Sequence, residues 1–231
     1  MRIPARVLFA LVALWITTAC ASARPPLEWE GHFIVYVTLG DAEPVPVGSE
    51  MRRYYPAEYR DEPVQAFESS GEIRLKLMGT EMTIVEEALS YTSLAGDPLY
   101  LEAGMGGDLE GAQRTIATYH PDRVDYVRRA GGEESRGSCI IPEGVSLRDP
   151  DYLFGPEAMP TGEPVTLHAF EPFSLEIQPV TMINEGRERA EVADRAFEGW
   201  RLEVDSEMLG PSTNWVDDEG LILGTRYTVG E

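Results

Sequence analysis

The sequence predicts an all-β protein with mostly antiparallel strands. Three observations support this: apolar and polar residues alternate with a period of two, short turns containing glycine or proline recur, and segments with a helical period are scarce. In the stretch EIRLKLM, Ile73, Leu75 and Leu77 fall on one side of an extended chain, and charged residues fall on the other. Such alternation is typical of sheets with one dry face and one wet face. We expect a curved meander sheet, a half-barrel or two stacked β-halves, with few short helices.

The alternating segments form two groups along the chain. The first group comprises strands expected near residues 32–39, 72–79, 81–92, 98–103, 112–120, 122–129 and 134–141. The second group comprises strands expected near residues 164–170, 173–183, 188–193, 197–206, 212–217 and 221–228. Most of the turns between them are too short for a helical crossover, so consecutive strands are expected to pair antiparallel.

Two stretches rich in proline and glycine are expected to be irregular. Residues 40–65 contain at most a short strand or turn at Met51–Arg60. Residues 142–162 connect the two groups of strands, with one helical turn expected at Asp151–Phe154. We therefore expect residues 24–231 to form a single β-rich domain with a hinge at 142–162.

The N-terminal residues have the layout of an export signal. A basic start is followed by an apolar run from Val7 to Ile16, too short to span a bilayer, and then by small residues. Two processing sites fit. Ordinary cleavage leaves 1–23 as the signal peptide, whereas lipoprotein processing leaves 1–19 and makes Cys20 the lipidated residue. We expect an exported protein of the periplasm or cell envelope, lipid-anchored if Cys20 is acylated.

The composition is strongly acidic and restricts the partners. The chain has 231 residues, with 40 acidic against 19 basic side chains and a formal net charge of −21. Such a surface repels phosphate backbones, so a nucleic-acid partner is not expected. No later segment is apolar enough for a transmembrane helix. If Cys20 is lipidated or removed, Cys139 has no internal disulfide partner, and stability must come from buried apolar surface.

The residue types that carry chemistry all have structural explanations. Asp217–Gly220 has consecutive acids rather than the alternate acids of a calcium loop, and it fits a hairpin turn with Gly220 at positive φ. Cys139 lies in a strand-like apolar setting that suits a small buried residue. The three histidines lack metal-ligand spacing. Glu86 and Glu87 are adjacent on a strand and point to opposite faces. The sequence predicts no catalytic residue, no cofactor, no metal site and no enzyme activity.

Methionine and aromatic side chains on the apolar face are the candidates for lining a ligand site. The candidate lining residues are Met78, Met82, Met182, Phe154, Phe170 and Phe173. They fit an adaptable apolar concavity, and they also fit an ordinary packed core.

The order of these motifs resembles the β-rich module found ahead of the catalytic domain in bacterial transglutaminase-like proteins. The resemblance rests on three stretches: residues 69–102, where a strand ending Leu-Met-Gly turns into a second long strand, the spacer 150–182 with Phe170-Glu171-Pro172, and the Trp-acid-Gly hairpin at 214–227. The resemblance implies an accessory or binding role, and it transfers no catalytic triad because Cys139 falls inside the β-rich module.

A second and weaker likeness is to exported lipoprotein carriers of the outer-membrane sorting system. The stretch SSGEIRLKL is similar to their early strands, and the likeness implies a curved sheet around an apolar hollow. We therefore expect a non-catalytic envelope protein that acts as a binding or accessory module, with an envelope protein or an apolar small molecule as partner. The first alternative is a periplasmic carrier of lipid or lipopeptide. The second alternative is an enzyme that uses Cys139.

Overall fold

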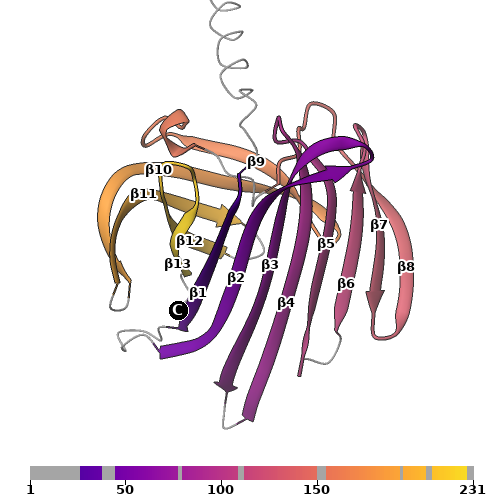
Figure 1. Cartoon of the computed structure of the whole chain (residues 1–231). Coiled ribbons are helices and arrows are strands. Elements are labelled where there is room, and N and C mark those ends of the chain that lie inside the picture. Colours follow the sequence, from indigo (N-terminus) through magenta and orange to yellow (C-terminus); the bar gives the residue numbers. More distant parts are fainter. Residues whose placement is uncertain are drawn as a thin grey trace, which may run out of the picture.

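The protein consists of two antiparallel β-sheets that together curve like an unclosed barrel (Figure 1). The computed structural model describes residues 27–37, 45–77, 80–108, 112–149, 155–192, 195–206 and 210–227. Within these ranges the regular structure is almost entirely strand, with one short 3₁₀-helix. The expected fold class, all-β and mostly antiparallel, is confirmed.

The larger sheet contains eight strands, β1 to β8, in chain order. Its strands are β1 Trp29–Val37, β2 Val45–Tyr59, β3 Glu62–Leu77, β4 Thr80–Ser93, β5 Pro98–Gly107, β6 Gln113–Tyr119, β7 Arg123–Ala130 and β8 Glu133–Ile140. Every neighbouring pair is antiparallel. This is the predicted meander, and it keeps sequence neighbours adjacent in space.

The smaller sheet contains five strands in the order β13-β12-β11-β10-β9. Its strands are β9 Pro164–Glu171, β10 Glu176–Val192, β11 Arg195–Ser206, β12 Gly210–Val216 and β13 Ile222–Tyr227. The 3₁₀-helix η1, Pro156–Ala158, precedes it. The change of sheet thus falls between Ile140 and Pro164, within the connection that the sequence predicts; a hinge there stays a prediction, and the helical turn expected at 151–154 lies outside the described residues.

The expectation that residues 40–65 are irregular is wrong, because most of this stretch forms β2 and the start of β3. Prolines at 46, 56 and 63 suggest loop because proline cannot donate a ladder hydrogen bond. In the sheet, Pro56 pairs in register with Gln65, and Pro63 with Glu58. Pairing on both sides of β2 overrides the local signal, since the flanking residues supply the ladder.

The two strands expected near 173–183 and 188–193 are one long strand, β10. A β-bulge between Asn184 and Gly186 separates its two halves, and Gly186 has a φ of 93°. Bulges bend a strand and increase its twist, and β10 curves strongly in Figure 1. The sequence near Gly186 therefore looks like a break between strands, whereas pairing with β11 continues across it.

The stretch Asp217–Gly220 is a hairpin turn, as the sequence predicts. The Asp217 carboxylate accepts hydrogen bonds from the backbone N–H groups of Glu219 (2.9 Å) and Leu221 (2.8 Å). Gly220 has a φ of 88°, a left-handed conformation that glycine adopts without a steric penalty. The Asp217 carboxylate therefore stabilises the turn in which it lies.

One face of the eight-stranded sheet packs against the five-stranded sheet at two places, and we call it the inner face. At one place Phe170 of β9 packs with Ala117 and Val124. At the other, Leu221 beside β13 packs with Tyr54 and Phe67. All six side chains are at most 5% exposed. These two clusters hold the sheets together mainly by burial of apolar surface.

Candidate functional site

Burial on the inner face is greatest in one row of side chains and lower on either side of it. Directly paired residues share a face, so one row runs across the sheet through Trp29, Tyr54, Phe67, Ser90, Leu101, Ala117 and Tyr126. Most of this row is packed; Phe67 is 5% and Ser90 2% exposed. The rows towards the β3–β4 turn, at the bottom of Figure 1, are less covered.

The less covered end carries a set of apolar side chains that we call the rim patch. Its members are inner-face residues of β1, β3, β4 and β5, each half-buried: Phe33, Val35, Ile73, Met82, Ile84 and Met105. Their outward neighbours on the same strands include polar residues such as Glu72 and Glu87. An apolar surface left partly open on the inner side of a curved sheet is the usual character of a ligand site.

Charged groups border the rim patch on the same face. Arg52 donates two hydrogen bonds to Glu50, from Nε (2.6 Å) and Nη2 (3.1 Å), and its guanidinium lies 5.7 Å from the Phe33 ring centroid. Glu50 pairs in register with Gly71, and Gly71 pairs with Glu86. Partial burial, and secondly the Glu50 carboxylate, raise the pKa of the Glu86 carboxyl, although the side chain still reaches solvent.

Replacement of Glu86 by Gln is expected to stabilise the fold at neutral pH. The raised pKa means that folding disfavours the ionised form, so stability declines as pH rises from the unfolded carboxyl pKa through the raised folded pKa. After solvent screening the gain should stay below about 1 kcal/mol. Urea unfolding at pH 7 and pH 4 checks this: E86Q should unfold at higher urea at pH 7 only. E87Q, on the outward face, is the control, and equal shifts in both variants would contradict the expectation.

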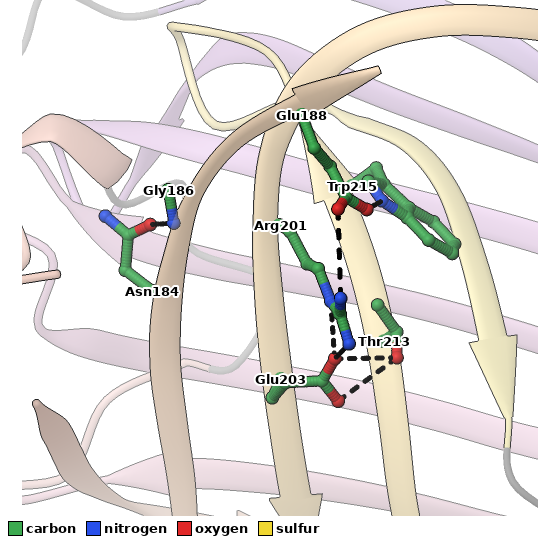
Figure 2. A network of polar contacts seen from close by, with 7 residues as sticks. All are labelled: Asn184, Gly186, Glu188, Arg201, Glu203, Thr213 and Trp215. Atoms are coloured by element: carbon green, nitrogen blue, oxygen red, sulfur yellow. Dashed lines mark hydrogen bonds and ion pairs between the residues drawn. The ribbon is translucent and has the colours of Figure 1, made fainter. Parts of the chain in front are cut away.

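A second polar network lies on one side of β10, β11 and β12 (Figure 2). Arg201 donates to Glu203 from Nε (2.7 Å), and its Nη1 lies 3.8 Å from a Glu188 oxygen. The Glu203 carboxylate also accepts from Thr213 (3.1 Å), and Trp215 Nε1–H donates to Glu188 (2.7 Å). Hydrogen bonds and charge from Glu203, with Glu188, raise the pKa of Arg201. The guanidinium is thus already engaged by its own chain, so the network fixes the three strands together.

The six predicted lining residues do not form one site. Phe170 is 3% exposed and lies in the packed cluster between the sheets. Met82 lies in the rim patch, whereas Met182 and Phe173 are half-buried on or beside the five-stranded sheet. Met78, Phe154 and the lipidation candidate Cys20 lie outside the described residues. A ligand-lining role for this set stays a prediction.

Cys139, His120 and His32 each have a different set of contacts. Cys139 packs against the cluster of Ala117, Val124, Leu147 and Phe170. His120 Nε2 lies 3.1 Å from Asp125, whose carboxyl pKa is lowered by a hydrogen bond from Ser138 and by Arg123. His32 contacts Glu30 at 3.3 Å, on the outward side of β1.

Two features are absent from the described residues. Across these ranges, no group of three or more His, Cys, Asp or Glu side chains is placed to hold a metal ion. In the same part of the chain, no helix is long and apolar enough to cross a bilayer.

Sequence reasoning missed Gly71 and Glu86 as neighbours and the rim patch as a unit. Their strands are recognisable from period-two alternation, and Ile73 and Ile84 each fall on the apolar side. The alternation does not show in which register the two strands pair. Gly71 and Glu86 are fifteen positions apart, and their pairing depends on where the β3–β4 hairpin turns.

The fold and this inner face define a β-barrel-like protein. A similar solved structure is titled the crystal structure of a β-barrel-like protein of Domain of Unknown Function DUF1849 from Brucella abortus. The TM-score is 0.63 at 8% sequence identity, and the match covers 89% of this chain and 92% of that one. The likeness at this identity concerns the fold alone. No protein-family model and no curated protein matches the sequence.

The resemblance to the module of transglutaminase-like proteins is wrong. Nearly the whole chain aligns with a β-barrel-like fold instead, and no transglutaminase-like family matches. The three stretches that carried the resemblance form hairpins and a connection, such as β3–β4 and β12–β13. Any antiparallel meander produces such features, so their order along the chain was not specific. The weaker likeness to lipoprotein carriers, a curved sheet around a hollow, is compatible with the barrel-like fold and is not tested by it.

Proposed function

We propose that the protein is an exported, non-catalytic binding module of the cell envelope, which holds its ligand on the rim patch of the inner face. The layout of residues 1–23 supports export, with Cys20 as a candidate lipid anchor. The packing of Cys139 against apolar side chains supports a role without a nucleophile, since an activated thiol needs a polar setting that stabilises its thiolate. The acidic composition favours ligands that are neutral or cationic.

One observation carries the proposal: the apolar rows at the rim end of the inner face are only half-buried, whereas the row through Tyr54, Phe67 and Ser90 on the same face is packed. Ile73 and Ile84 pair directly across β3 and β4, and Met105 lies one row away on β5. A fold stabilised by apolar burial gains from covering such side chains. Leaving this group partly open on an inward face is typical of a surface that is covered by a ligand.

The proposal predicts that I84E abolishes binding of an apolar probe, while V85E does not. Both residues are half-buried on β4, but Ile84 points into the rim patch and Val85 points outward. The enhancement of N-phenyl-1-naphthylamine fluorescence on binding is the measurement. We expect the wild type and V85E to enhance it similarly and I84E to lose at least about tenfold in affinity, because burying an unpaired carboxylate against an apolar ligand is costly. Far-UV circular dichroism shows whether both variants fold.

An unchanged affinity in I84E, or no probe binding by the wild type, would contradict the proposal. The second candidate, a carrier of lipid or lipopeptide, is favoured by Met82 and Met105 in the rim patch, because flexible thioethers adapt to varied chains. Native mass spectrometry of protein purified from the envelope distinguishes them: a co-purifying acyl-chain mass supports carriage. The intact mass also shows whether Cys20 is acylated.

A further inference from the structure

Gly71 lies in the middle of β3 on the inner face, between two carboxylates. Glu50 of β2 and Glu86 of β4 are its direct register partners, and on the same face Met105 pairs with Glu86 while Phe33 pairs with Glu50. With strands spaced at about 4.8 Å, the two glutamates start about 10 Å apart with no side chain between them. The row therefore has a gap at Gly71, with acids beside the gap and apolar side chains beyond them.

Among the described residues, no contact requires glycine at position 71. An added Cβ would make only ordinary contacts, 3.6 Å from Glu50 Cγ and 3.6 Å from the Ser49 carbonyl oxygen, and Gly71 does not have a positive φ. By contrast, a Cβ on the nearby Gly48 or Gly107 would collide with a backbone carbonyl oxygen. Glycine destabilises the interior of a strand. Where the backbone conformation does not require glycine, the residue often marks a site that a ligand approaches closely.

The charge at the gap comes from Glu86. Glu50 is neutralised by its two hydrogen bonds from Arg52. In the described part of the chain, no hydrogen bond or ion pair reaches the Glu86 carboxylate, which is exposed to solvent beside Ile84 and Met105 and partly desolvated. A cation beside this carboxylate would stabilise its charged form.

We infer that the rim patch takes a cationic amphiphile, whose positively charged head lies over Gly71 against Glu86 and whose apolar chain lies on Ile73, Ile84 and Met105. This inference rests on the proposed binding role and narrows the chemical class of the ligand. Charge complementarity selects a positively charged head, since no ion pair among the described residues neutralises the Glu86 carboxylate. The half-buried apolar side chains of the rim patch favour a ligand that carries an apolar chain.

Calorimetric titration with three amphiphiles of one chain length tests the inference. The probes are dodecyltrimethylammonium, dodecyl maltoside and dodecanoate, each below its critical micelle concentration and at physiological salt. The wild type should bind the cationic probe on the order of tenfold more tightly than the neutral probe, and the anionic probe most weakly. Physiological salt suppresses attraction to the acidic surface in general.

Three variants test whether the preference for the cationic probe depends on Glu86 and on the gap at Gly71. E86Q should bind the cationic and neutral probes with equal affinity, and E87Q, on the outward face, should keep the wild-type preference. G71L should weaken all three probes at least about tenfold, because its side chain occupies the gap and its Cβ makes only ordinary contacts. Circular dichroism checks that G71L folds; if it does not, G71A, which adds only the Cβ, replaces it with a smaller expected loss.

The outcomes separate the inference from the proposed function. Equal wild-type affinity for the cationic and neutral probes, or a preference that persists in E86Q, would overturn the inference. If the neutral probe nevertheless binds and I84E abolishes that binding, the proposed function stands. Loss of the preference in E87Q as well as in E86Q would assign it to general surface charge and also overturn the inference.

Discussion

Substitution of Phe170 by Ala is expected to lower the free energy of unfolding by about 3–5 kcal/mol. Phe170 is 3% exposed and packs between the sheets with Ala117 and Val124. Its ring stacks on Tyr126 at 6.2 Å and meets the edge of Tyr119 at 6.3 Å. Removal leaves a cavity that the sheets cannot close, because the same cluster joins β6 and β7 to β9. Equilibrium urea unfolding followed by tryptophan fluorescence gives the measurement.

The matched control is F173A, the same chemical change three residues later. Phe173 is half-buried in the turn after β9, so its removal opens less closed space. We expect F173A to cost less than half as much as F170A. Equal losses in the two variants would show that the joint between the sheets does not depend on Phe170, and a loss below about 1 kcal/mol in F170A would show the same.

Substitution of Asn184 by Asp should cost about 3 kcal/mol or more. Asn184 is fully buried at the β10 bulge. Its Nδ2 donates to the carbonyl oxygens of Pro156 (2.8 Å) and Met159 (3.2 Å), and its Oδ1 accepts from Gly186 N–H (2.9 Å). A carboxylate keeps the bond from Gly186 but sets negative charge against two carbonyl oxygens. The connection through η1 would then separate from β10.

N214D provides the comparison for this prediction. Asn214 is half-buried on β12, and its Oδ1 accepts from Thr225 Oγ1 at 2.7 Å, a bond that a carboxylate can keep. We expect N214D to cost less than about 1 kcal/mol. Urea unfolding measures both variants, and limited proteolysis near Pro156 reports the connection: increased cleavage in N184D alone is expected. An N184D protein as stable as N214D would contradict the role assigned to the amide.

Period-two alternation predicted the strand content because the rule depends on local burial alone. Leu202 is 8% exposed while its strand neighbours Glu203 and Arg201 remain partly open, as the alternation in WRLEVDSEM indicates. Glu86 and Glu87 likewise point to opposite faces, as expected for adjacent strand residues. The same rule missed β2, where prolines outweigh a weaker alternation, and it divided β10 at the bulge near Gly186.

The candidate site could not be predicted in the same way. Phe170 and Met82 have the same sequence signal, an apolar residue on the dry side of a strand, yet one is packed between sheets and the other lies in the rim patch. Which of them is covered depends on the position of the five-stranded sheet, whose apolar contacts with the larger sheet, among the described residues, include the cluster around Phe170 and the cluster around Leu221. Similarly, Gly71 looks like an ordinary weak point in a strand until register places Glu50 and Glu86 on either side.

The amino-acid sequence by itself determined that this chain forms antiparallel strands and hairpins, because alternation and turn chemistry act between residues close in sequence. It also fixed the acidic character, through the count of charged side chains. Only the tertiary structure decided which apolar residues become core and which remain open, and which side chains flank Gly71 on the neighbouring strands. Those properties arise from register and from the approach of two sheets, which bring together residues far apart along the chain.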